Sequence, residues 1–220
     1  FIIGIGGSAT NDGGIGMLKA LGFEFFDKNG NDVGEGAAAL AKIAEIRTEK
    51  KNPLLSGTKF QIACDVKNPL CGKQGATYIF GPQKGVTEEQ KEQVDEAMRH
   101  YADVTKESLD CDFADCEGAG AAGGLGYAFL SYLAGELLPG VELILQATGL
   151  EEKMKNADVV VTGEGRLDAQ TVMGKAPAGV AALAKNIMRK SLHLQGALHR
   201  KRKSVTGRES MHFSRSSVEW

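Results

Sequence analysis

The sequence lacks the features that mark several large classes of protein. No apolar run among its 220 residues approaches the roughly 20 that a helix needs to cross a bilayer. The four cysteines show neither the paired CxxC spacing of a zinc site nor the density of a disulfide scaffold. No basic segment precedes an apolar core and a small-residue cleavage site, as in a secretory signal. We therefore expect a cytoplasmic protein with reduced thiols and no membrane partner.

Two common nucleotide-binding patterns are also missing. The chain contains no GxxxxGK[ST] phosphate loop and no clean dinucleotide-binding fingerprint. Neither a P-loop kinase nor a Rossmann dehydrogenase is therefore supported.

Glycine is abundant, and it gathers between apolar segments. The chain has 29 glycines, about double the usual share of ~7%. Four glycine-rich loops follow predicted strands or open predicted helices, and they span residues 6–14, 65–85, 118–124 and 162–175. In such positions the exposed backbone N–H groups and the helix dipole favour an anion such as phosphate.

Predicted strands and helices alternate along the chain, which indicates an α/β or mixed α+β fold. Short apolar runs predict strands at residues 1–5, 23–26, 59–66 and 158–162. Apolar residues at helical spacing predict helices at residues 15–21, 37–46, 87–109, 124–133, 141–154 and 177–186.

Charged residues of both signs accompany the glycine loops. The carboxylates are Asp12, Asp65, Glu164 and Asp168, and the cations are Lys84, Arg166 and Lys175. Mg²⁺ prefers one or two carboxylates together with phosphate oxygens, and Lys or Arg neutralises the charge that spreads during phosphoryl transfer. A carboxylate can also orient or deprotonate the attacking hydroxyl. The combination favours phosphoryl transfer.

Structural explanations compete with a site role at several of these positions. Asp12 alone is better explained as a helix cap, and glycines 118–124 can serve close helix packing. Asp65 ends a predicted strand, where a turn residue and a site residue are equally expected. The charged run 164–168 could form surface ion pairs, but its place after a buried strand favours a site.

Four long motifs add a more specific signal. Their sequences are GIGGSATNDGGIGMLKALG, ACDVKNPLCGKQGATYIFGPQKG, GAGAAGGLGYAFL and VVVTGEGRLDAQTVMGKAPAGVAALAK. In this order and at these separations they resemble the bacterial glycerate kinase family of the two-domain type, over residues 1 to about 186. The resemblance implies ATP- and Mg²⁺-dependent phosphorylation of D-glycerate, chiefly at the 2-hydroxyl, which gives 2-phosphoglycerate.

The resemblance also implies a domain organisation. Residues 1–156 would form the inserted mixed α/β domain of a glycerate kinase, and residues 157–186 would return in part to a flavodoxin-like α/β domain built from both chain ends. The Asp-Ser-Phe-Lys motif that begins the family pattern is absent, and Phe1 reads as the middle of a strand. We therefore expect the chain to be an N-terminally truncated fragment that is inactive by itself.

The predicted site combines these residues in three roles. Asp168, Arg166 and Lys84 are the predicted catalytic residues, and Asp65 and Glu164 the predicted Mg²⁺ ligands. Gly7, Ser8, Asn11, Asp12, Asn68, Gly163 and Lys175 are the predicted substrate- or phosphate-binding residues. Two alternatives remain open: a hydrolase or isomerase of a phosphorylated small acid, and a non-catalytic anion- or small-acid-binding fragment.

The segment 187–220 differs in character from the rest of the chain. It holds 8 Lys and Arg against 2 Asp and Glu, whereas residues 1–186 hold 18 against 26. If the third base of each codon is read with the first two of the next, the code permits the family-like string GIDAFFPIVRGV across residues 208–220. We interpret residues 187–220 as a frameshift-derived tail that is disordered or poorly packed. Its basic run 200–203 is therefore not assigned to nucleic-acid binding.

Sequencing the gene across this junction tests the interpretation. We expect an inserted or deleted base near the codons for Lys185 and Asn186, because the family-like pattern stops there. An intact reading frame that encodes the tail would contradict the frameshift.

Overall fold

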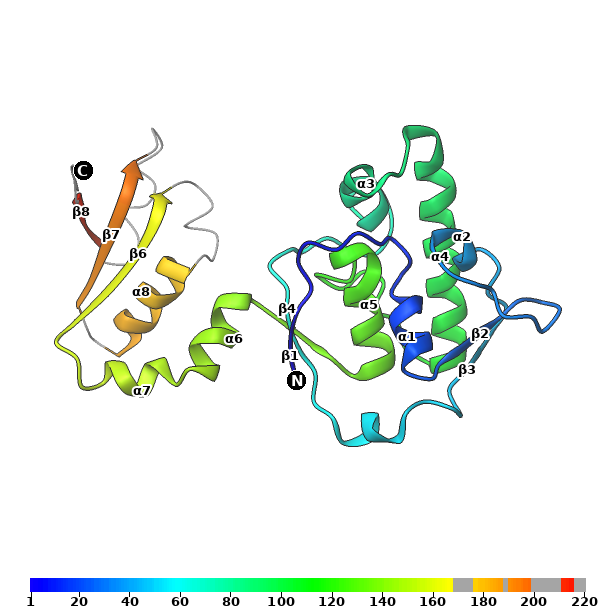
Figure 1. The fold of residues 1–220 in the computed structure, drawn as a ribbon, viewed down its shortest axis with the longest axis horizontal. Coiled ribbons are helices and arrows are strands. Elements are labelled where there is room, and N and C mark those ends of the chain that lie inside the picture. Colours follow the sequence, from blue (N-terminus) through cyan, green and yellow to red (C-terminus); the bar gives the residue numbers. More distant parts are fainter. Residues whose placement is uncertain (168–175, 188–189, 199–210, 216–220) are drawn as a thin grey trace. The chain divides into compact units, whose positions relative to one another are not determined.

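The computed structural model describes residues 1–167, 176–187, 190–198 and 211–215. The chain divides into two compact units, residues 1–138 and residues 139–220 (Figure 1). The sequence predicts a later domain boundary, after residue 156. The assignment of these two units to the two domains of the family stays a prediction.

The first unit is built on a parallel sheet of three short strands. Its strands are β1 (Ile2–Gly4), β4 (Gln61–Ala63) and β5 (Glu136–Leu138), in the order β1-β4-β5. Ile3 of β1 pairs with Ile62 of β4, which pairs in turn with Leu137 of β5. Because all three strands run in the same direction, the loops that follow β1 and β4 leave the sheet at the same edge.

The first unit has five α-helices. They are α1 (Ile15–Ala20), α2 (Ala37–Leu40), α3 (Ala76–Phe80), α4 (Lys91–Leu109) and α5 (Ala121–Leu133). In Figure 1, α5 stands between the strands β1 and β4 on one side and α4 on the other. Tyr101 of α4 and Tyr127 of α5 are both buried, and their rings meet edge to face with centroids 5.5 Å apart. The large apolar core of this unit therefore lies between α4 and α5 and extends to the sheet.

A capping box, which the run Thr87-Glu88-Glu89-Gln90 predicts, precedes the long helix α4. Thr87 and Gln90 cap each other through side chain and backbone, and the short 3₁₀ turn Glu88–Gln90 leads directly into α4. This arrangement satisfies two N–H groups that a helix start otherwise leaves without partners.

One predicted helix is wrong over most of its length. The helix expected at residues 37–46 ends at Leu40, and Glu45–Arg47 forms strand β3, antiparallel to β2 (Glu24–Phe26). In this pairing Ile46 lies opposite Phe25, which is fully buried. Packing against a neighbouring strand thus decides the structure of this segment over its helical spacing.

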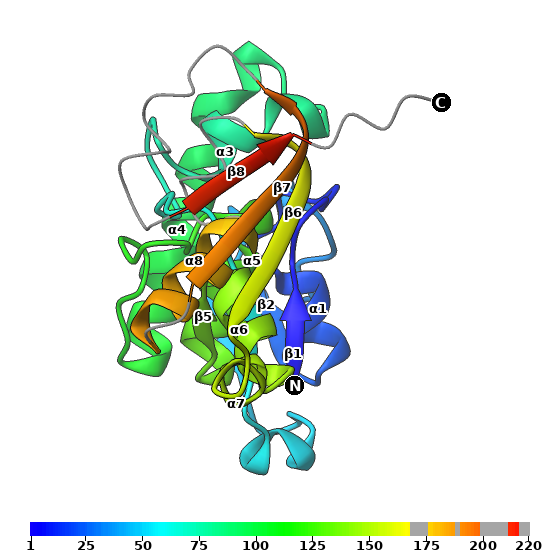
Figure 2. The ribbon, with the colours of Figure 1, turned by 90° about the vertical axis from the view of Figure 1, so that its left-hand side faces the viewer.

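The second unit contains a parallel sheet of three strands covered by a helix. Its strands are β6 (Val159–Leu167), β7 (Lys190–Leu198) and β8 (Met211–Arg215), in the order β6-β7-β8. Figure 2 shows them side by side and running in the same direction. Helix α8 (Ala176–Asn186) packs on this sheet, with Ala184 and Val160 in one small core with Met154.

Two details of the second unit differ from the sequence predictions. The helix expected at 141–154 is divided into α6 (Gly140–Ala147) and α7 (Leu150–Met154), because Gly149 between them has a left-handed backbone with φ 60°. The tail, predicted to be disordered or poorly packed, contains β7 and β8, and apart from these strands only Ile187 of it lies in the described part of the chain. Its origin in a shifted reading frame stays a prediction.

The predicted α/β class is confirmed by parallel strands and packed helices in both units. In the described segments, no helix combines the length and the apolar character that crossing a membrane requires.

The two neighbouring phenylalanines of β2 give a test of the core. Phe25 is fully buried against Tyr101 and Tyr132, whereas Phe26 is half-buried beneath the guanidinium of Arg47. We expect Phe25→Ala to lower the free energy of unfolding by about 3–5 kcal/mol because it leaves a cavity. The matched control Phe26→Ala should lower it by about 1 kcal/mol. Urea denaturation measures both, and equal losses would contradict the assignment of the core face.

Candidate functional site

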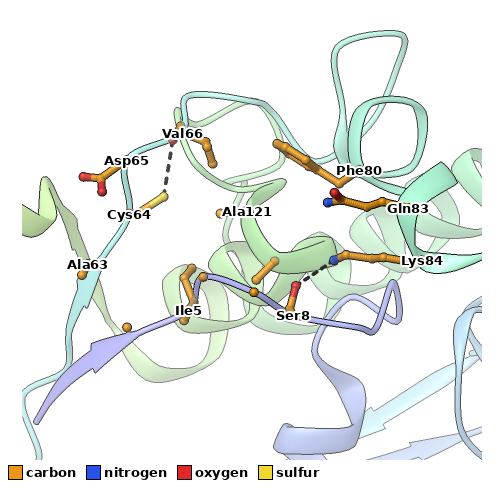
Figure 3. Close-up of a pocket in the computed structure, with 14 residues that line it drawn as sticks. Ile5, Ser8, Ala63, Cys64, Asp65, Val66, Phe80, Gln83, Lys84 and Ala121 are labelled. Carbon is orange, nitrogen blue, oxygen red and sulfur yellow. Dashed lines mark hydrogen bonds between the residues drawn. The ribbon is translucent and has the colours of Figure 1, made fainter. Parts of the chain in front are cut away.

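A pocket of about 600 Å³ opens in the first unit where β1 and β4 end (Figure 3). Residues 4–8 line it from the end of β1 and the loop that follows, and residues 63–66 line it from the end of β4 and the loop that follows. Phe80, Gln83 and Lys84 contribute from α3 and the short 3₁₀ turn Pro82–Lys84, and residues 121–122 from the start of α5. Parts of the first three glycine-rich loops therefore meet at one pocket, at the edge of the sheet where ligands of α/β proteins gather.

The ammonium of Lys84 is fixed at the wall of this pocket by uncharged partners. Its Nζ donates to Ser8 Oγ over 2.8 Å and to the carbonyl oxygen of Thr10 over 2.7 Å. Burial lowers the pKa of Lys84 from its ordinary value, and the charge of Asp12 partly opposes this effect. Within the described residues, Lys84 makes no ion pair with a carboxylate. Its positive charge is therefore available to an anion in the pocket.

Asp65 is the other charged residue among those that line the pocket. It is exposed, and Figure 3 shows it and Lys84 on opposite sides of the pocket. The neighbouring Cys64 donates its thiol hydrogen to the carbonyl of Val66 over 3.4 Å. Among the described residues that line it, the pocket thus has one cation and one carboxylate.

Helix α5 begins with an irregular turn that leaves room for this arrangement. Ala122, Gly123 and Gly124 have left-handed backbones, with φ of 55°, 73° and 91°. A Cβ atom on Gly123 would lie 2.1 Å from the carbonyl oxygen of Thr10 and 3.0 Å from Lys84 Nζ. Only glycine allows the backbone of residue 10 to approach so closely. Close packing and a site role therefore coincide in the third glycine loop.

Three of the predicted binding residues hold neighbouring loops and do not line the pocket. Asp12 accepts hydrogen bonds from the N–H groups of Gly14 and Gly16, at 3.0 and 3.3 Å, at the start of α1. Asn68 donates to the carbonyl of Gln74 over 2.7 Å. Asn11 is buried and donates to Thr77 Oγ1 of α3 over 3.1 Å. A direct contact of these side chains with a ligand stays a prediction.

The remaining predicted site residues belong to the second unit. Gly163, Glu164 and Arg166 were expected in a loop, but β6 continues through Leu167 and includes them. Glu164 pairs with Gln195 of β7, and this pairing in the sheet extends the strand beyond the glycines that suggested a turn. Asp168 and Lys175 lie outside the described residues. The convergence of Asp65, Lys84, Glu164 and Arg166 in one centre stays a prediction.

Sequence reasoning missed three contributors to the pocket region. The carbonyl of Thr10 is a backbone group, so no side-chain pattern could reveal it. Thr77 sits in α3, which follows a glycine-rich stretch that gave no helical signal. Gln83 lines the pocket and directly precedes Lys84, and that adjacency was the one signal available.

Comparisons with known proteins place the chain in a family. A family model described as the glycerate kinase family matches residues 1–215. The chain belongs to the glycerate kinase family. The match continues beyond residue 186, where the quoted motifs end, and it confirms the resemblance seen in the sequence.

Several known proteins are closely similar to this member of the glycerate kinase family. It is 46% identical over 204 residues to the glycerate kinase of Bacillus subtilis (strain 168), covering 93% of this chain and 53% of the relative. It is 46% identical over 197 residues to the glycerate 2-kinase of Escherichia coli (strain K12), covering 90% and 52%. A crystal structure assigned to glycerate kinase 2 from Salmonella typhimurium LT2 superposes with a TM-score of 0.86 at 42% identity, covering 97% and 56%. The chain thus spans about half the length of the curated relatives it matches.

The buried thiol of Cys71 gives a prediction about how the rate of its alkylation depends on pH. Burial, followed by the charge of Asp95, raises the pKa of Cys71 to about 12 from an ordinary 9.0. The reactive thiolate at pH 8 is therefore about a thousandfold scarcer than for an ordinary thiol. We expect the rate of iodoacetamide alkylation at Cys71 to keep rising about tenfold per pH unit up to pH 10. Mass spectrometry of the Cys71 peptide measures the rate, with a free cysteine peptide in the same tube as control. A rate that levels off near pH 9 would show an unperturbed thiol.

Proposed function

We propose that the chain is part of a glycerate kinase that transfers a phosphoryl group from ATP to D-glycerate and gives 2-phosphoglycerate. The observation that carries the proposal is the ammonium of Lys84, held by two neutral oxygens at the wall of a pocket that parts of three glycine-rich loops help to line. Membership of the glycerate kinase family supports the reaction class.

The surroundings of Lys84 suit an anionic substrate. Ser8 Oγ and Thr10 O orient the ammonium without neutralising it, so an incoming phosphate or carboxylate displaces no existing ion pair. A charge fixed in place before the reaction stabilises the negative charge that spreads over the transferred phosphoryl group. Lys84 is therefore proposed to neutralise phosphate charge.

The residues present fit a Mg²⁺ ion bound together with ATP. Mg²⁺ takes one or two protein carboxylates and fills its other positions with phosphate oxygens and water. Asp65 is the carboxylate that lines the pocket, and the described residues include no group of three or more metal-binding side chains that would form a complete protein site. We propose Asp65 as a ligand of this ion, and Glu164 of β6 stays a second candidate ligand; a bound Mg²⁺ would neutralise charge on the ATP phosphates.

We also propose roles for residues of the second unit. Arg166 and Lys175 would add positive charge for the phosphates, Gly163 would bring its backbone to them, and Asp168 would orient the 2-hydroxyl of glycerate. The proposed enzyme is cytoplasmic, with D-glycerate and ATP as small-molecule partners. Because the chain spans about half the length of its relatives, we expect the 220-residue chain alone to be inactive.

Replacement of Lys84 tests this function. In a full-length, frame-restored enzyme, Lys84→Met should lower kcat/KM for D-glycerate by about 100-fold or more, because a preorganised charge is lost. The matched control Lys67→Met removes an exposed lysine that pairs with Glu117 and should change kcat/KM less than about twofold. A coupled assay of ADP release measures both.

Three results would contradict parts of the proposal. No ADP release from the full-length enzyme with D-glycerate would exclude the kinase and favour a hydrolase or isomerase. Full activity of Lys84→Met would remove this residue from the chemistry. ADP release by the 220-residue chain alone would show that this chain is active without the rest of the protein.

A further inference from the structure

A buried polar contact links the first glycine loop to helix α3 close to the site. Asn11 Nδ2 donates to Thr77 Oγ1 over 3.1 Å, and the two residues are 66 positions apart in the sequence. Asn11 is 8% exposed and Thr77 is 0% exposed, so water does not compete for this hydrogen bond. Buried side-chain contacts of this kind fix the relative position of the segments they join.

This contact closes a ring of interactions that contains Lys84. Thr77 also accepts, through its carbonyl, the N–H of Gly81 over 3.0 Å, and Gly81 accepts the N–H of Lys84 over 2.8 Å. From there the side chain of Lys84 reaches the carbonyl of Thr10, the residue bonded to Asn11. Four hydrogen bonds and the intervening backbone thus form one closed circuit. Opening it at Asn11–Thr77 removes one of the links between the loop that carries the acceptor Thr10 O and the turn that carries Lys84.

The choice of asparagine is difficult to explain by stability alone. Asn11 Oδ1 is buried and meets no hydrogen-bond donor in the described protein. A buried acceptor without a partner destabilises the folded state, and an apolar residue of similar size would avoid the problem. What asparagine adds is the donor Nδ2, which an apolar residue could not offer to Thr77.

We propose that Asn11 and Thr77 are positioning residues that hold the ammonium of Lys84 at the pocket wall. Asn11 then acts through Lys84 and need not touch the substrate. That the place of the Lys84 ammonium matters for catalysis rests on the proposed function. That Asn11 and Thr77 hold the ammonium there does not.

The state of Lys84 can be measured in the 220-residue chain without any enzymatic assay. The pH dependence of amine acylation at Lys84, followed by mass spectrometry, gives the midpoint of its titration. Burial holds the pKa of Lys84 below 10.5, and Asp12 is the charged group that acts on it in the opposite direction. An ammonium released into solvent loses this effect of burial.

Thr77→Val, which keeps the size of the side chain and removes the hydroxyl, should raise the Lys84 midpoint toward 10.5. Thr77→Ser keeps the hydroxyl and should restore the wild-type midpoint. Thr105→Val is the matched control, because Thr105 is equally buried and its hydroxyl bonds to Tyr101 O and Tyr132 Oη, away from Lys84. It should lower the midpoint of urea unfolding and leave the Lys84 midpoint unchanged.

Asn11→Leu is a second variant in case Thr77→Val does not fold. It removes the acceptor that lacks a partner together with the donor, so it should raise the Lys84 midpoint without the loss of stability expected for Thr105→Val. An unchanged Lys84 midpoint in both Thr77→Val and Asn11→Leu would overturn the proposal. So would an equal rise in Thr105→Val, because the rise would then follow from lost stability.

The two experiments distinguish the proposed catalytic role of Lys84 from its proposed positioning by Asn11 and Thr77. If the Lys84 midpoint rises as expected while Lys84→Met keeps full kinase activity in the longer enzyme, the positioning role stands and the catalytic role of Lys84 fails. If the midpoint does not move while Lys84→Met is inactive, the catalytic role of Lys84 stands and the positioning role of Asn11 and Thr77 fails.

Discussion

The hydrogen bonds from Lys84 to Ser8 and Thr10 join two loops that leave the sheet after different strands. The first loop follows β1, and the second follows β4 and reaches Lys84 through α3. A lysine whose partners are neutral oxygens keeps its full charge, while its charge-assisted hydrogen bonds fix the direction of its side chain. The chemical character of the pocket depends on this combination of fixed direction and unpaired charge.

The backbone of residues 10–14 helps to hold Lys84 and its acceptor in this arrangement. Gly13 donates to the carbonyl of Gly123 over 2.9 Å, and the carboxylate of Asp12 is occupied by two N–H groups at the start of α1. The negative charge of Asp12 is therefore near enough to favour the protonated form of Lys84 but is engaged by backbone groups. The aromatic core between α4 and α5 holds this loop from the other side, because Tyr101 packs against Gly13.

Sequence patterns predicted the parts of the structure that depend on local chemistry. The capping box at Thr87 and the strand ends near Gly7 and Asp65 are readable because each needs only a few neighbouring residues. The strand Glu45–Arg47 and the extension of β6 past Gly163 depend on partner strands far along the chain, so local spacing misled the prediction there. The pocket follows the same division: Lys84 was singled out by the glycines around it in the sequence, whereas its acceptor Thr10 O and the neighbouring Thr77 are seen only in the folded chain.

The close approach at Gly123 has a consequence for how this site can change over evolutionary time. Because a single methyl group there would collide with the backbone oxygen of Thr10, and not with a movable side chain, no neighbouring substitution can make room for it. We therefore expect variation in the pocket at lining residues with longer side chains, such as Phe80 and Gln83. Changes in ligand preference would begin at those two positions, while the close contact between Gly123 and the backbone of Thr10 stays the same.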